Sequence, residues 1–251
     1  MKTQELMDVA LKAGEILLTS GAEIYRVEDT VTRICRSYNV ECYSFVLPTG
    51  IFISMTRKAQ QSVSAIKRIK ERRVDLYRIE LINGFSRSLQ SNPVTYEEAV
   101  KILKNIEGTR RYPFGVRLLL AGMEAFAFTL LLKSSIAEGL AALFISMFIY
   151  AFKGKVEEIG FFQFFEYFIS GIIAGGAALI AVKAVSGLNI YKTIIGSIII
   201  LLPGVAITSG IKDALYGDIV SSLARLGEAI FIAVAVGAGV GIMLSVGLPW
   251  V

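Results

Sequence analysis

The 251-residue chain carries its net charge in one part and is sparse in charge in the other. Residues 1–113 hold 18 Lys and Arg against 13 Asp and Glu, whereas residues 114–251 hold eight of each sign, so the net charge of +5 lies entirely in the first part. Hydrophobic residues make up 54% of the chain, and the mean hydropathy of +0.61 exceeds that of soluble globular proteins. This division excludes a uniformly soluble protein and predicts an integral membrane protein with a soluble N-terminal part.

Several classes of chemistry are disfavoured by composition. The chain has no histidine, and its two cysteines, Cys35 and Cys42, match no metal or disulfide framework. Ser44, Thr49 and Cys35 are candidate nucleophiles for a membrane-anchored hydrolase, but none has an evident base, so we expect no enzyme, no catalytic residue and no cofactor. The basic half lacks the aromatic interleaving of nucleic-acid binding. Attraction to an anionic cytoplasmic membrane face explains its charge better, and we expect lipid but no nucleic acid as a partner.

Residues 1–110 are expected to form a cytoplasmic α+β domain. Helical spacing of apolar residues predicts helices over residues 3–20 and 22–38, with Gly21 ending the first. A hairpin is predicted from strands 40–47 and 51–56, and a third strand around 62–70. Asp75 and Thr95 are placed as N-caps of two further helices, the second with Glu98 completing a capping box.

Residues 111–251 are expected to form an α-helical transmembrane bundle of about five spans. Each apolar window comes near the roughly 20 residues that cross a bilayer. Arg110, Arg111 and Arg117 flank the first window, which favours a cytoplasmic N-terminus of a multi-pass protein in the cytoplasmic (inner) membrane. An odd number of spans then puts the far end of the last helix outside. The five windows are residues 114–132, 136–152, 161–182, 190–209 and 226–246.

Ionisable residues at membrane depth are costly and therefore functional candidates. Glu124 lies ten residues into the first window and could exchange protons; its alternative role is to pair with a cation or a backbone group inside the bundle. No nucleotide-binding P-loop occurs in the sequence, so we expect the proton gradient to supply the work. Asp213 and Asp218 are the other candidate proton carriers.

The fourth window contains the strongest candidate for a substrate site. Pro203 removes a backbone donor and Gly204 relaxes the helix, so we expect a break there. A broken helix near mid-membrane leaves backbone groups free to bind a polar solute. The alternative is an ordinary proline kink followed by a polar loop. The predicted substrate-binding residues are Pro203, Gly204, Thr208, Ser209, Asp213, Asp218 and Arg225.

The chain resembles the threonine/serine exporter family over nearly its whole length. The resemblance lies in GEILLTSGAEIYRVEDT (residues 14–30) and LPTGIFIS (residues 47–54), followed in order by Pro203-Gly204, Asp213, Gly217-Asp218 and RLGE (residues 225–228). It implies a cytoplasmic N-terminal domain and outward movement of small polar metabolites. Longer members carry a second membrane half, about ten spans in all. This chain is therefore similar to the split type, in which a second five-helix membrane protein supplies the other half.

The leading hypothesis is a subunit of a secondary transporter that exports threonine and serine, driven by the proton gradient. Some split pairs of the family are associated with dicarboxylates, so export of a dicarboxylate such as succinate is the alternative. A dianion would require more than one cation, and Lys183, Lys192, Lys212 and Arg225 are available for it. Besides the second half, further copies of this chain are candidate partners.

Overall fold

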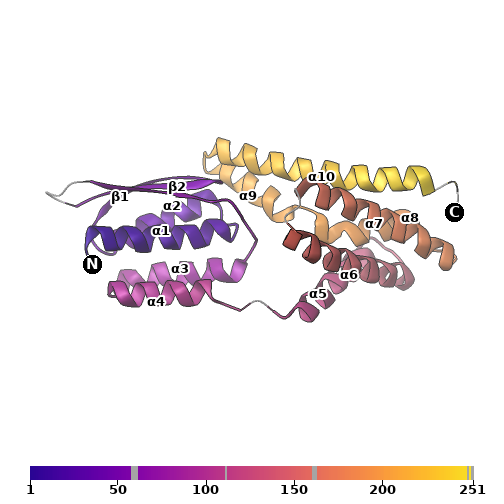
Figure 1. Ribbon diagram of the computed structural model, residues 1–251, viewed down its shortest axis with the longest axis horizontal. Helices are drawn as coiled ribbons and strands as arrows, with labels where there is room; N and C mark the ends of the chain where they lie inside the picture. Colours follow the sequence, from indigo (N-terminus) through magenta and orange to yellow (C-terminus); the bar gives the residue numbers. More distant parts are fainter. Residues whose placement is uncertain (58–61, 111, 160–162, 248, 250–251) are drawn as a thin grey trace. The chain divides into compact units, whose positions relative to one another are not determined.

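The computed structural model describes residues 1–57, 62–110, 112–159, 163–247 and 249, and it divides into two compact units (Figure 1). The mixed unit consists of residues 1–110 and 204–227, and the helical unit consists of residues 111–203 and 228–251. Arg111, which contributes to the predicted orientation, lies outside the described residues. The last helix contributes its first turns to the mixed unit and the rest to the helical unit.

The N-terminal part of the mixed unit has three layers (Figure 1). The outer layer is an antiparallel sheet in the order β1-β2-β3, made of β1 (Glu41–Leu47), β2 (Gly50–Thr56) and β3 (Val63–Arg68). Helices α1 (Thr3–Thr19) and α2 (Ile24–Arg36) cover one face of the sheet, and α3 (Leu76–Ser91) and α4 (Tyr96–Glu107) pack against these helices. This arrangement confirms the predicted α+β elements.

Local sequence explains where these elements begin and end. Gly21 ends the first helix at a φ of +83°, a backbone conformation that costs glycine little. Leu47 pairs with Gly50, so Pro48 and Thr49 form the hairpin turn. The side chain of Asp75 accepts a hydrogen bond from the Arg78 amide, and Thr95 forms the expected capping box. Helix α1 lies between the sheet and the outer helices, which explains why it buries apolar side chains on more than one face.

The membrane helices number four or five, as the sequence predicts. Four helices are long and apolar enough to cross a bilayer: α5 (Phe114–Leu131), α6 (Ile136–Ile159), α7 (Gln163–Ala184) and α10 (Ile219–Gly247). Helix α8 (Ile190–Ile198) continues into a short 3₁₀ turn, η1 (Ile199–Leu201), and meets the same criterion only together with α9 (Gly204–Leu215).

The interruption lies where the sequence predicts it. Leu202 is extended, with φ −69° and ψ 132°, because the ring of a following proline disfavours the helical conformation. Pro203 is followed at once by α9, where a proline costs no hydrogen bond because the first helical N–H groups have no partner within the helix. The break at Pro203 and Gly204 is therefore confirmed.

Glycines allow α7 and α10 to pack closely within the helical unit. A Cβ atom on Gly171 would overlap the Val236 carbonyl, and one on Gly239 would overlap the Phe168 carbonyl. Small residues permit this backbone approach between membrane helices. By contrast, a Cβ atom on Gly237 would have no neighbour within 4 Å. Only some of the glycines in these helices therefore serve packing.

Candidate functional site

The turn between α9 and α10 is built by Gly217 and Asp218. The Asp218 amide donates to the Asp213 carbonyl at 2.8 Å and the Gly217 amide to the Ala214 carbonyl at 3.0 Å, with Gly217 at φ +88°. These bonds form a Schellman motif, which ends α9. The Asp218 carboxylate then accepts a hydrogen bond from the Ser221 amide at 3.2 Å and caps α10. The structure thus gives Asp218 a role in shaping the turn.

A buried ion pair joins the two sides of this turn. Asp213 Oδ2 lies 3.0 Å from Arg225 Nε, and their side chains are 0% and 4% exposed. Both residues also bind the backbone of the connector between α1 and α2. Asp213 Oδ1 accepts a hydrogen bond from the Ile24 amide at 2.9 Å, and Arg225 Nη2 donates one to the Ala22 carbonyl at 2.7 Å. We call this set of contacts the junction.

Two side-chain contacts extend the junction. Lys212 Nζ lies 2.8 Å from Glu23 Oε1, and Arg26 Nε lies 2.8 Å from Glu23 Oε2. The rings of Tyr25 and Tyr216 stack with centroids 3.9 Å apart and planes 14° from parallel. Helical spacing alone indicates an exposed, weak Glu23–Arg26 pair; in the structure Glu23 is buried and held by two cations. No local pattern could have identified its second partner, which lies 189 residues away.

The charge on Glu23 is stabilised at this position. Desolvation acts to raise the pKa of Glu23, but the Lys212 hydrogen bond, a backbone hydrogen bond and the nearby cations outweigh it, so the pKa lies below its usual 4.5. A lowered pKa contributes stability above the unfolded-state value, and that contribution is lost as the pH falls through the folded-state value.

We therefore expect Glu23→Gln to flatten the acid side of the stability profile. The wild-type chain should lose more stability than the variant as the pH falls from 7 to about 3, because only the wild type must protonate this carboxylate. Thermal unfolding of the purified chain in detergent measures this difference. Exposed Glu97→Gln on α4 is the matched control. Parallel profiles for wild type and Glu23→Gln would contradict the assignment.

The remaining predicted substrate residues lie along α9. Thr208 is exposed, and its hydroxyl donates to the carbonyls of Gly204 and Val205 in its own helix. Ser209 is buried and 4% exposed. Thr208 and Ser209 therefore follow the break by about one helical turn, while Asp213 and Arg225 meet in the junction.

Glu124 is not part of the junction. It is exposed on α5, in the helical unit, beside the exposed side chains of Leu120, Met123 and Phe128. The described residues therefore do not enclose this carboxylate within the chain's own bundle.

A second buried carboxylate in the helical unit escaped sequence reasoning. Glu138 is 5% exposed and accepts hydrogen bonds from the amides of Ser135 at 2.6 Å and Asn189 at 2.8 Å. The Ser135 hydroxyl in turn accepts from the Glu138 amide, which completes a capping box. The S-x-x-E spacing is the signal that could have identified it. Glu138 joins the α5–α6 and α7–α8 connections, a structural role.

Comparison with known proteins extends over almost the whole chain. Residues 8–247 match the family model described as "Putative threonine/serine exporter". The chain is 25% identical to the "Probable threonine/serine exporter" of Mycobacterium tuberculosis, over 98% of this chain and 46% of that protein. It is 27% identical to the "Threonine/serine exporter" of Corynebacterium glutamicum, over 96% of this chain and 51% of that protein. The chain thus spans about half the length of these relatives. No solved structure matches it.

Proposed function

Because the chain belongs to the threonine/serine exporter family, we propose that it is a subunit of a secondary transporter that exports threonine and serine across the cytoplasmic membrane. The observation that carries this proposal is the buried Asp213–Arg225 pair, which follows the interruption at Pro203 on the next helix. Ionisable groups near an interrupted membrane helix are typical of transporter solute sites.

An amino acid is a better substrate than a dicarboxylate for this arrangement. A dianion needs more than one available cation, but Lys212 is bound to Glu23 and Arg225 to Asp213. The ammonium group of Lys192 donates to the Lys133 carbonyl at 2.8 Å. An α-carboxylate can instead use the free N–H groups at the start of α9, at Gly204, which carry the positive end of the helix dipole.

We place proton coupling first at Asp213. This carboxylate is buried and holds both Arg225 and the Ile24 amide, so protonation would weaken an ion pair and a charge-assisted hydrogen bond together. Asp218 caps a helix, and Glu124 lies on an exposed face. They are the second and third candidates.

Efflux from loaded cells tests the function. Cells that contain the chain and are loaded with labelled threonine should release it faster than cells without it, and a protonophore should slow the release. Serine loaded together with threonine should compete, and succinate should not. Competition by succinate alone would replace the amino acid by a dicarboxylate, and release that is insensitive to the protonophore would contradict proton coupling.

The junction also supports a topology with five crossings. Residues 22–24 bind Asp213 and Arg225, so the N-terminal domain and the α9–α10 turn belong on the same side of the membrane. The number of crossings between them must then be even. Since α5, α6 and α7 make three, we infer that the interrupted pair of α8 and α9 makes the fourth and α10 the fifth. Residues 1–110 are then the cytoplasmic domain and residues 111–251 the five-helix membrane domain.

We expect opposite sides for the two ends of the chain. A tag placed after Val251 should be accessible from outside intact cells, whereas a tag before Met1 should be accessible only after permeabilisation. A cysteine replacing Ser186, an exposed residue after α7, should react with an impermeant maleimide from outside when Cys35 and Cys42 are changed to Ser. Two tags accessible from the same side would contradict the crossing of α8 and α9.

We further propose that a second membrane half, supplied by a separate protein, completes the path. The relatives are about twice as long as the chain, which leaves room for such a half. Glu124 supports it as well, because a charged residue near the middle of a lipid-facing helix costs about 2.5–3.5 kcal/mol. A partner helix over this face of α5 would shield the carboxylate. Copurification from native membranes tests this, and full transport by the purified chain alone would contradict it.

A further inference from the structure

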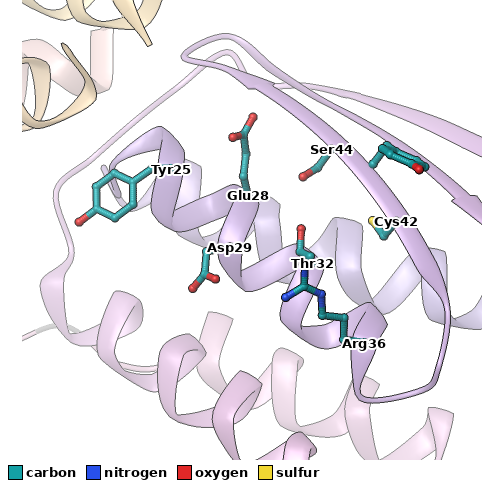
Figure 2. Close-up of a pocket in the computed structure, with 8 residues that line it drawn as sticks. Tyr25, Glu28, Asp29, Thr32, Arg36, Cys42 and Ser44 are labelled. Carbon is teal, nitrogen blue, oxygen red and sulfur yellow. The ribbon is translucent and has the colours of Figure 1, made fainter. Parts of the chain in front are cut away.

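A polar groove of about 410 Å³ lies in the mixed unit between α2 and the edge strand β1 (Figure 2). Side chains three or four residues apart share one face of a helix, and side chains two apart share one face of a strand. Four residues of α2 and two of β1 meet these spacings along the groove: Tyr25, Glu28, Thr32, Arg36, Cys42 and Ser44. The transport path proposed above does not use this groove.

The groove holds one cation and one carboxylate at opposite ends. Asp29 also lines it but forms an ion pair with Arg33 on the next turn of α2. Arg36 is exposed, and in the part of the chain that the structure describes no ion pair involves it. Glu28 Oε1 accepts a hydrogen bond from the Val46 amide at 3.0 Å, which leaves the carboxylate further acceptor capacity. The groove therefore offers a guanidinium and a carboxylate to a ligand.

The spacing of these charges suits a small ligand. Glu28 and Arg36 are eight residues apart, about 12 Å along the axis of an α-helix. Helical side chains lean toward the N-terminus, and in Figure 2 the Arg36 side chain runs along α2 toward Thr32, which shortens the gap. A charge-assisted hydrogen bond of about 2.8 Å at each end leaves room for a small molecule. Ser44 and Thr32 add hydroxyl groups between the two charges.

We propose that this groove is a binding site for a free zwitterionic amino acid, with the ligand's carboxylate at Arg36 and its ammonium group at Glu28. A dicarboxylate would meet the Glu28 charge, and a simple amine would leave Arg36 without a partner. The choice of threonine and serine as ligands rests on the proposed export function. Their hydroxyl groups match the polar lining of the groove.

Tyr25 connects this site to the junction. It lines the groove with one part of its side chain and stacks on Tyr216, the residue before the Gly217-Asp218 turn. Desolvation raises the pKa of Glu28, the Val46 amide partly lowers it, and the charges of Asp218 and Asp213 raise it further. A ligand's ammonium group at Glu28 would therefore act on the same electrostatic environment as the junction. The site is placed to sense the cytoplasmic amino acid and to affect the α9–α10 turn.

The chain contains its own reporter for this proposal. Cys42 lines the groove and is partly exposed, whereas Cys35 is fully buried, and these are the two cysteines of the chain. In the purified full chain, N-ethylmaleimide should therefore modify Cys42 first, and mass spectrometry would follow both sites. Threonine and serine should slow modification of Cys42, but succinate and ethanolamine should not. No protection by either amino acid, or equal protection by all four compounds, would overturn the proposal.

Two variants test the assigned contacts. Arg36→Gln and Glu28→Gln should each raise the threonine concentration needed for protection by about tenfold or more, because each removes a charge-assisted hydrogen bond. Arg87→Gln on α3 changes another exposed arginine and should leave protection unchanged. Modification of Cys35 would reveal unfolding in any variant. Undiminished protection in either groove variant, with Cys35 unmodified, would overturn the proposal.

The labelling result and the efflux result are independent. Labelling of Cys42 reports the groove directly, so absent protection with normal threonine export contradicts the groove site alone. Protection without any threonine export contradicts the proposed function and leaves an amino-acid binding site in the domain.

Discussion

Asp213→Asn should abolish threonine export and destabilise the chain by about 3–5 kcal/mol, the typical result of removing one partner from a buried ion pair. The amide oxygen can still accept the Ile24 hydrogen bond, but Arg225, 4% exposed, loses its counter-charge. The junction should loosen because the same guanidinium holds the Ala22 carbonyl. Thermal unfolding in detergent and threonine efflux from loaded cells measure the two effects.

A double variant separates the structural role of this pair from its transport role. Asp213→Asn with Arg225→Met removes both charges, and replacing a buried ion pair by uncharged residues is often close to neutral for stability. Stability should therefore recover while export stays absent. Asp218→Asn is the control for stability, because Asn caps a helix as well as Asp does. If the double variant exports threonine normally, the pair is structural and Asp213 does not carry the proton.

The second large effect is expected from Gly239→Ala, in α10. The added Cβ would overlap the Phe168 carbonyl and lie 2.9 Å from the Ile172 amide nitrogen, and both neighbours are backbone atoms of α7 that cannot rotate away. Overpacking of this kind typically costs about 1–3 kcal/mol. The unfolding midpoint in detergent should fall, and the amount of protein in the membrane should fall with it.

Gly237→Ala is the matched control for this clash. It changes the same residue type in the same helix, but its Cβ would have no neighbour within 4 Å. Because alanine favours helix over glycine, this variant should be at least as stable as the wild type. Equal destabilisation by both variants would show that α7 and α10 do not pack as described.

Sequence patterns were sufficient wherever the physical cause is local. The hydrophobic windows give the membrane helices, because a bilayer of fixed thickness requires about 20 apolar residues. Pro203 breaks the fourth window through its own ring and missing N–H, and the break appears at that residue. Gly21 and the caps at Asp75 and Thr95 likewise act within a few residues. The family resemblance followed from motifs in order along the chain.

Contacts between distant segments required the tertiary structure. No periodicity could pair Glu23 with Lys212, or bring the Ile24 amide to Asp213, because 189 residues separate the partners of each contact. Nor could the sequence show that Glu124 lies on an exposed face of α5, since the burial of a membrane residue depends on which helices surround it. Local chemistry therefore determined the elements of this protein, and packing between distant segments decided which charges meet.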